Sequence, residues 1–175
     1  MVYLISGATH SGKTVLAKKL VELTGGFCLS LDHLKMGLIR SKMTTLKVKD
    51  DKELTSFMWP IVKEMIKTAI ENDQDLIIEG CYIPFDFKKS FTKKYKDNIR
   101  ELILLMDLNY VGKHYDDIIN FANVAENRKK DDVTLEVLID DNNYYYQNAI
   151  RHHLNYYIFG DEFDLDDMAS KLLKK

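Results

Sequence analysis

Gly7-Ala8-Thr9-His10-Ser11-Gly12-Lys13-Thr14 is the stretch that decides the fold of this chain, because it fits the pattern G-x-x-x-x-G-K-[ST]. A short apolar run, residues 2–6, precedes it and is typical of a β-strand. Residues 14–23 follow it, and their leucines repeat at the spacing of one helix face. A strand, a glycine loop and a helix in this order predict a loop that binds phosphate groups.

Each residue type in this loop has a chemical reason to be there. Gly7 and Gly12 allow the backbone to curl so that successive N–H groups point at an anion, and the following helix adds its positive end. Lys13 brings a full charge to the β- and γ-phosphates, and the Thr14 hydroxyl is a ligand for Mg²⁺. The loop therefore predicts a nucleoside triphosphate as a partner, with residues 7–14 in contact with it.

The composition is typical of a globular protein with a core of its own. The chain has 175 residues, of which 46% are hydrophobic and 30% charged, and we expect a single domain over residues 1–175. The net charge of −2 gives no basic field that would attract nucleic acid. No apolar run approaches the ~20 residues that span a bilayer, so we expect no membrane partner. The oligomeric state stays open.

Two isolated cysteines, Cys28 and Cys81, form neither a metal-binding nor a disulfide pattern. Both lie in or beside predicted strands, where we expect small buried thiols. The first strand begins at residue 2 and leads directly into the glycine loop, so we expect no signal peptide. These features favour a cytoplasmic protein, because thiols stay reduced there.

Strand and helix patterns alternate along the chain. The predicted strands cover residues 2–6, 27–31, 76–79, 101–107 and 156–159. The third and fourth strands are continuous apolar runs, as expected for parallel strands buried on both faces. The alternation predicts an α/β fold in three layers, with a parallel sheet between helices.

The segments between these strands give the expected helices. Helices are predicted over residues 34–41, from Pro60 as a first residue, over 87–94, and near the C-terminus with Asp166 or Asp167 opening the last helix. Residues 43–52 are polar and predict a loop. Residues 110–151 are strongly polar and fit two helices with a charged turn between them. The three tyrosines at residues 144–146 favour packing in the core or an interface.

Acidic residues stand at the ends of three predicted strands. Ligands of an open α/β sheet bind at the carboxyl ends of its strands. Asp32 follows the second strand, Glu79 ends the third, and Asp107 ends the fourth. Carboxylates beside phosphate groups repel them unless they hold Mg²⁺, orient a water or take a proton. Turn chemistry explains Asp107 at least as well.

Asp32 is the candidate for the general base that accepts the proton of an attacking hydroxyl, and it would also contact the substrate. An N-cap for the following helix is the competing interpretation, because Asp is a favoured cap. Glu79 would position a magnesium-bound water or hold a substrate hydroxyl. A salt-bridged strand end is the equally open alternative for Glu79.

The chain has four arginines, namely Arg40, Arg100, Arg128 and Arg151. Because they are few, each can be considered separately as a partner for phosphate oxygens. Arg128 lies in the polar segment 110–151, from which it would swing onto the γ-phosphate, bind the nucleotide and stabilise the transition state. Arg151 is a second candidate for the same task. Lys35 and Arg40 follow Asp32, where an anionic substrate would dock. A charged, solvated face is the competing interpretation for Arg128 as well as for Lys35 and Arg40.

These features together resemble the small P-loop kinases of the nucleoside monophosphate kinase type. The similarity is greatest to kinases of small metabolites, such as shikimate, gluconate, chloramphenicol and 2-phosphoglycerate, and to zeta-toxin-like kinases. It rests on residues 7–14, the Walker A motif, on Ser30-Leu31-Asp32, and on Leu-Ile-Ile-Glu-Gly at residues 76–80. The resemblance implies ATP, Mg²⁺, a five-stranded parallel sheet in the order 2-3-1-4-5, and a helical lid over about residues 110–151.

The resulting expectation is a magnesium-requiring phosphotransferase that moves the γ-phosphate of ATP to a hydroxyl of a small-molecule substrate. A nucleoside monophosphate kinase is the first alternative, but the interior of this lid has one arginine, Arg128, where adenylate kinases have more. A nucleotide-binding module without catalysis is the second alternative. The acceptor, and the choice between ATP and GTP, stay open.

Overall fold

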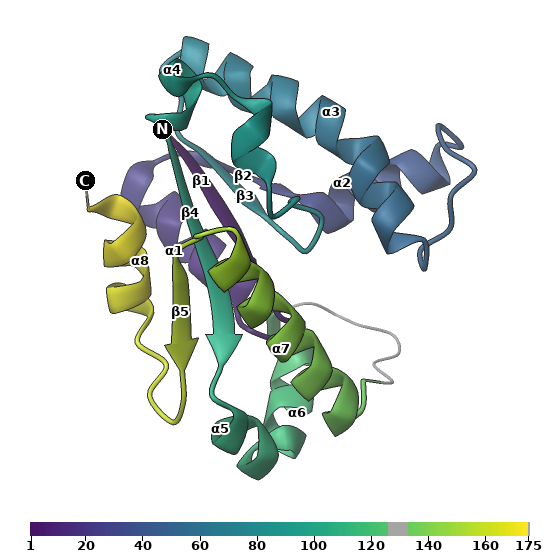
Figure 1. Cartoon of the computed structure of the whole chain (residues 1–175), viewed down its shortest axis with the longest axis vertical. Helices are drawn as coiled ribbons and strands as arrows, with labels where there is room; N and C mark the ends of the chain where they lie inside the picture. The colour runs from purple at the N-terminus through teal and green to yellow at the C-terminus, as the bar shows by residue number, and fades with distance from the viewer. Residues whose placement is uncertain (126–132, 175) are drawn as a thin grey trace.

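A five-stranded parallel sheet forms the centre of the computed structural model, which describes residues 1–125 and 133–174 (Figure 1). The strands run in the order β2-β3-β1-β4-β5, and all neighbours are parallel. Their bounds are β1 Val2–Gly7, β2 Phe27–Ser30, β3 Leu76–Glu79, β4 Ile99–Met106 and β5 Tyr156–Phe159. The expected α/β architecture and its strand order are therefore confirmed.

Helices cover both faces of this sheet. They are α1 (Lys13–Thr24), α2 (Leu31–Arg40), α3 (Asp51–Glu71), the 3₁₀ helix η1 (Phe87–Ser90), α4 (Lys93–Lys96), α5 (Leu108–Lys113), α6 (Tyr115–Ala125), α7 (Leu135–Arg151) and α8 (Leu165–Leu173). Helices α1 and α8 pack together on one face, whereas α3 and α7 contact the central strands from the other (Figure 1). Within the described residues, no helix combines the length and apolar character needed to cross a membrane.

The hydrophobic core is built on the middle strands. All six residues of β1 and all four of β3 are buried. Strand β4 is buried except for Arg100. These strands carry large aliphatic side chains that pack against helices on both faces. Each fully buried side chain of this kind stabilises the fold by about 1.5–3 kcal/mol, because its apolar surface is removed from water. The core thus fixes the carboxyl ends of β1, β3 and β4 side by side.

Gly7 allows the chain to leave β1 against its neighbour. Its φ angle is +143°, and a Cβ at this position would overlap the backbone carbonyl of Leu104 in β4. The next residue, Ala8, donates its N–H to that same carbonyl at 3.1 Å. A side chain at residue 7 would therefore push the loop away from the sheet edge where it must lie.

Helix α3 corrects two expectations from the sequence. It begins at Asp51 and runs through Pro60, which is an interior residue and not the first one. The predicted loop therefore ends at residue 50, and Asp51 and Lys52 are helical. Packing explains the continuity, because Leu54, Met58 and Val62 on either side of the proline are buried in the core.

Other element ends also differ from the expectation. The predicted helix over residues 87–94 is a 3₁₀ turn, η1, followed by the short helix α4. Asp164 caps α8 by accepting the N–H of Asp167 at 2.8 Å, so neither Asp166 nor Asp167 opens that helix. Asp107 caps α5, with Asn109 N at 2.9 Å and Tyr110 N at 3.1 Å, as its turn chemistry suggested.

The expectation of two buried cysteines was wrong, because both Cys28 and Cys81 are exposed. Cys28 lies on β2, which is an edge strand of the sheet. Cys81 lies just after β3, beyond the end of the packed strand. The exposure of each cysteine therefore follows from its position at the edge or beyond the end of the sheet. The apolar residues around it in the sequence do not predict this exposure.

Candidate active site

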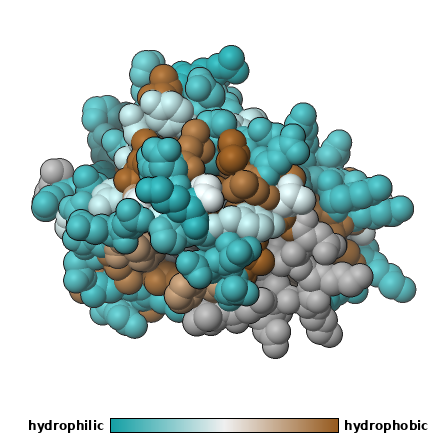
Figure 2. Space-filling view, turned by 90° about the horizontal axis from the view of Figure 1, so that it is seen from below, coloured by the Kyte–Doolittle hydropathy of each residue, from teal (hydrophilic) through white to brown (hydrophobic). Residues whose placement is uncertain are grey.

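A cavity of about 670 Å³ opens at the carboxyl end of the sheet. Its charged wall consists of Lys13, Asp32, Lys35, Asp51, Lys52 and Asp141. Its other lining residues are Thr9, Thr55, Cys81, Tyr82, Tyr144 and Tyr145. The arrowheads of β4 and β5 point down in Figure 1, so Figure 2 views this end of the molecule, where hydrophobic side chains gather among hydrophilic ones.

The phosphate loop joins β1 to α1, and its residues Thr9 and Lys13 line the cavity. Gly12 precedes α1 with a φ of +81°, and a Cβ there would lie 2.8 Å from the ring of Phe163. The Lys13 ammonium is turned back onto the loop, with Nζ 3.1 Å from the Gly7 carbonyl oxygen and 2.7 Å from that of Ala8. A curled loop with its lysine at the rim suits a polyphosphate.

Thr14 and Glu79 bring two oxygen donors together beside this loop. The Thr14 hydroxyl donates to Glu79 Oε2 at 3.3 Å, and Glu79 is only 3% exposed at the end of β3. No cluster of three or more His, Cys, Asp or Glu side chains is placed to hold a metal in the described part of the chain. A hydroxyl and one carboxylate fit Mg²⁺, which takes one or two protein ligands and completes its shell with phosphates and water.

Asp32 belongs to the first turn of α2, and Ser30 occupies the N-cap position. The alternative role of Asp32 as the cap is therefore wrong. Its Oδ1 lies 2.7 Å from Lys35 Nζ, and its side chain is 44% exposed, so the carboxylate remains open to the cavity. A partly exposed carboxylate that is oriented by an ammonium can accept a proton from a bound ligand.

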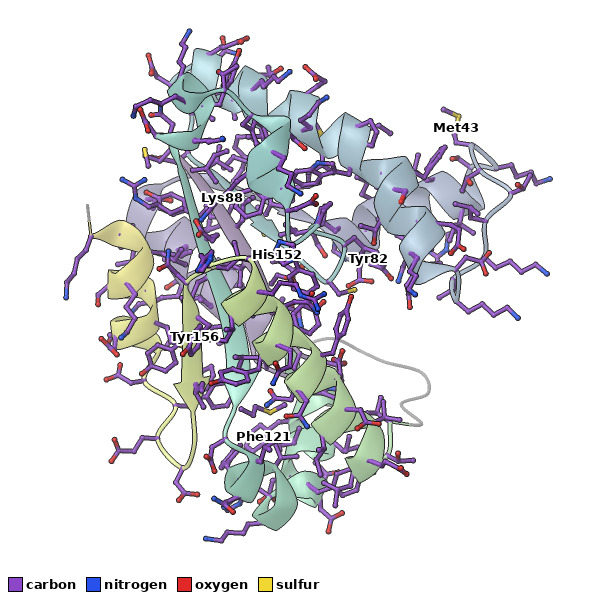
Figure 3. All side chains as sticks on the ribbon, viewed as in Figure 1. Met43, Tyr82, Lys88, Phe121, His152 and Tyr156 are labelled. Carbon is purple, nitrogen blue, oxygen red and sulfur yellow. The ribbon has the colours of Figure 1, made fainter. Side chains whose placement is uncertain are left out.

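Lys35 is buried and connects Asp32 to residues that lie far along the chain. It donates to the Tyr82 hydroxyl at 2.6 Å, and its ammonium lies 4.8 Å from the centre of the Tyr82 ring. Tyr82 in turn donates to Asp51 Oδ1 at 2.9 Å. Figure 3 shows Tyr82 between the arm formed by α2 and α3 and the helix α7. The four side chains form one continuous polar chain along the cavity.

Tyr82 in this polar chain and the adjacent Cys81 both have raised pKa values. Burial, followed by the neighbouring Cys81 and Asp51, raises the pKa of the Tyr82 phenol far above its usual value, so the hydroxyl keeps its proton. Desolvation, followed by the charge of Asp32, raises the pKa of the Cys81 thiol to about 11 although this residue opens onto the cavity. Cys81 is therefore a thiol at neutral pH and a poor nucleophile.

Helix α7 contributes a carboxylate to the phosphate loop itself. Asp141 Oδ2 accepts the backbone N–H of Thr9 at 2.6 Å. Burial is the main cause that raises the pKa of Asp141, and the Thr9 N–H and the Lys13 charge oppose that rise. An acid inside an anion-binding loop is unexpected, because the loop is suited to a phosphate oxygen.

Tyr144 and Tyr145 of α7 form the aromatic wall of the cavity. Tyr145 is buried and its hydroxyl donates to the Cys81 carbonyl at 3.3 Å. The ring of Phe85 packs edge-on against both, with ring centroids 5.5 Å from Tyr144 and 5.4 Å from Tyr145. The core packing expected for the tyrosine cluster is present at Tyr145, but the same residues also face the cavity.

Several residues singled out in the sequence lie together here. Thr9 and Lys13 of the loop line the cavity with Asp32 and Lys35, and Glu79 adjoins the loop through its contact with Thr14. Arg40 does not, since it lies exposed at the end of α2 and outside the cavity lining. Arg151 likewise lies exposed at the end of α7. Arg128 falls outside the described residues.

Asp51, Tyr82 and Asp141 were missed in the sequence. Asp51 lies in the segment 43–52, which was predicted to be a loop. Tyr82 and Asp141 belong to no sequence motif. They reach the cavity through the packing of α3, of the segment after β3, and of α7. The sequence indicated an acceptor pocket built from residues 34–52, 82–87 and the lid, and these segments contain all three residues, although none of the three was singled out.

In a comparison with known protein families, the zeta toxin family model matches residues 1–106 of this chain. The matched segment contains the phosphate loop, Asp32, Lys35, Asp51, Glu79 and Tyr82. No curated protein sequence matches this chain significantly.

Solved structures with the same fold include several kinases. The tunicamycin resistance protein of Deinococcus radiodurans is 16% identical, with a TM-score of 0.59 over 98% of this chain and 92% of that one. Shikimate kinase from Acinetobacter baumannii in complex with shikimate is 17% identical, with a TM-score of 0.55 over 99% and 90%. Deoxyadenosine kinase from M. mycoides is 12% identical, with a TM-score of 0.58 over 99% and 97%. At these identities the comparison shows a shared fold, and the expected resemblance to small P-loop kinases is confirmed.

Proposed function

Because the chain belongs to the zeta toxin family, we propose that it is a kinase that transfers the γ-phosphoryl group of ATP to a hydroxyl of a small molecule. One observation carries the proposal: Lys13 of the phosphate loop and the carboxylate of Asp32 line the same cavity. A kinase needs a phosphate-binding group and a proton acceptor on either side of the transferred group. A cytoplasmic location, where ATP is abundant and thiols stay reduced, is part of the proposal.

The residues of the chain divide the work of this reaction. The backbone of residues 7–14 holds the polyphosphate, and the Lys13 ammonium leaves the carbonyls of Gly7 and Ala8 to pair with phosphate oxygens. Thr14 Oγ1 and the Glu79 carboxylate would hold Mg²⁺, which neutralises charge on the phosphates when it is bound. Arg128 is proposed to add a further positive charge to the transferred group.

Asp32 is proposed as the general base. The acceptor hydroxyl gives its proton to the Asp32 carboxylate as its oxygen forms a bond to the γ-phosphorus. The bond between that phosphorus and the bridging oxygen breaks, and ADP leaves with its electron pair. Lys35 orients Asp32 through the 2.7 Å contact and is itself held by the Tyr82 hydroxyl.

The cavity lining favours a small hydroxyl compound over a nucleoside monophosphate as the acceptor. The described lining contains three lysines and three aspartates and no arginine, so its formal charge is balanced. Lys35 is already engaged by Asp32 and Tyr82. Acceptors with a phosphate of their own are usually bound by the bidentate fork of arginine, which this lining does not offer.

A panel of acceptors tests the proposal directly. The protein is mixed with Mg-ATP and, in turn, with sugars, polyols, hydroxy acids, nucleosides and nucleoside monophosphates, and ADP release is measured. We expect one hydroxyl class to raise ADP release, and Asp32→Asn to lower the turnover about 10²–10⁴-fold while ATP binding persists. The exposed Asp73, whose positive φ also suits asparagine, provides the control Asp73→Asn. A response to monophosphates alone would favour the nucleotide kinase, and ATP binding without any turnover would favour a non-catalytic module.

A further inference from the structure

We propose that Asp141 is an internal ligand of the phosphate loop, which a nucleotide must displace before its phosphates can bind. This inference rests on the proposed function, because it assumes that residues 7–14 bind polyphosphate. It adds a self-blocking contact that no sequence motif indicates. The contact joins α7 to a loop 132 residues earlier in the chain.

The geometry places the carboxylate where an anion belongs. Asp141 Oδ2 lies 2.6 Å from the backbone nitrogen of Thr9, at the short end of the distances that N–H donors make to an oxygen acceptor. Thr9 is the third residue of the loop, whose N–H groups cradle phosphates in loops of this type. Asp141 and a phosphate oxygen cannot both accept that N–H, and two anions at this distance repel each other.

Displacement of Asp141 requires a rotation of one side chain and leaves the helix in place. The neighbouring Asn142 is buried and bonds to Met106 of β4 twice, with its Oδ1 2.8 Å from the Met106 N and its Nδ2 2.8 Å from the Met106 carbonyl oxygen. Tyr145, one turn further, is buried as well. These anchors hold α7 against the sheet while Asp141 leaves the loop.

The surroundings of Asp141 oppose its charged form, which favours displacement of the internal ligand. Burial raises the pKa of the carboxyl, which shows that its charged form loses more hydration in the loop than its neighbours restore. Those neighbours are His10 and Lys13 at the loop and Asp51 from α3, of which Asp51 is repulsive. On release, the carboxylate regains water and Thr9 N–H becomes available to the incoming phosphate.

The affinity for inorganic triphosphate, measured by calorimetry with and without Mg²⁺, tests this competition. Asp141→Ala removes the internal acceptor and is expected to tighten binding roughly tenfold, since a bond to a charged group no longer has to be broken first. Asp141→Asn keeps an acceptor oxygen without the charge, so we expect an intermediate gain. The control is Asp140→Ala, one residue earlier on α7, where the side chain is exposed and outside the cavity lining.

The two proposals fail in different ways in this experiment. If the wild-type protein binds triphosphate and both Asp141 variants bind it equally or more weakly, the internal ligand is refuted while the phosphate site stands. If no form of the protein binds triphosphate, the proposed function fails and the internal ligand fails with it. A gain in Asp140→Ala as large as that in Asp141→Ala would also refute the proposal, because a general effect on α7 would then explain it.

Discussion

The Tyr82 hydroxyl is the link that joins two parts of the candidate site. It accepts from Lys35 at 2.6 Å and donates to Asp51 at 2.9 Å, and so connects α2 to α3 through a buried tyrosine. Lys35 in turn holds Asp32. At the scale of single residues, the position of the proposed base therefore depends on a phenol that takes no part in the reaction itself.

Replacement of this hydroxyl tests that dependence. Tyr82→Phe keeps the ring beneath Lys35 but leaves Lys35 and Asp51 each without one partner, so we expect a loss of about 1 kcal/mol in the free energy of unfolding. Turnover should fall about tenfold as Asp32 becomes less well oriented, while the Kd for Mg-ATP stays the same. Steady-state kinetics, calorimetry and urea unfolding measure these three quantities. The control is Tyr156→Phe on the outer strand β5, and unchanged turnover in Tyr82→Phe would contradict the positioning role.

Cys81 gives a pH-dependent readout of the cavity. Its pKa is raised to about 11, and the thiolate is the reactive form, so alkylation by iodoacetamide should speed up about tenfold per pH unit from neutral pH and level off near pH 11. Mg-ATP should slow the reaction, because Cys81 lines the cavity with Lys13. The experiment uses Cys28→Ser to isolate Cys81.

Cys28 supplies the matched control for this measurement. Its pKa is also raised to about 11, by desolvation and then by Glu79, but it lies on the edge strand β2 and outside the cavity lining. In Cys81→Ser, alkylation of Cys28 should follow the same pH curve without protection by Mg-ATP. A rate for Cys81 that levels off near the ordinary thiol pKa of about 8.5 would contradict the structure.

At the scale of elements, the sequence predicted those strands and helix ends that depend on the local pattern of residues. The strands β1, β3 and β4 are continuous apolar runs and were found, as were the ends of α1 at the glycines and the final strand β5. The path of α3 was not predicted, because proline is usually a start signal and the burial of Leu54 and Met58 is a tertiary effect. The exposure of Cys28 likewise follows from the place of β2 at the sheet edge.

Pro60 offers a test of how α3 is stabilised. Proline has no N–H, so the Ser56 carbonyl lacks its usual helical partner inside α3. We expect Pro60→Ala to raise the free energy of unfolding by about 1 kcal/mol, after the entropy that proline removes from the unfolded chain is taken into account. Urea unfolding measures the change. The control is Ser56→Ala, which raises the helix propensity and removes only the exposed bond from Ser56 Oγ to the Lys52 carbonyl oxygen at 3.1 Å. A gain in Pro60→Ala no larger than in that variant would contradict the interior position of the proline.

At the scale of the whole molecule, the site divides into a local part and a packed part. The phosphate loop and Asp32 could be predicted, because each lies within a few residues of a strand end and the sheet brings such ends together. Asp51, Tyr82 and Asp141 could not, because they meet only after α3 and α7 pack against opposite sides of the cavity. In Figure 3, Tyr82 lies between the arm formed by α2 and α3 and the helix α7, whereas Met43 lies at the tip of that arm.

The proposed function of the whole molecule requires that the loop 7–14 binds the polyphosphate of a nucleotide. Calorimetric titration of Mg-ATP into the wild-type protein and into Lys13→Ala tests it most directly. The control is Lys18→Ala, an exposed lysine on the same helix α1. We predict binding by the wild-type protein and by Lys18→Ala, and a loss of affinity of about a hundredfold or more in Lys13→Ala. Equal affinity in all three proteins would contradict the account.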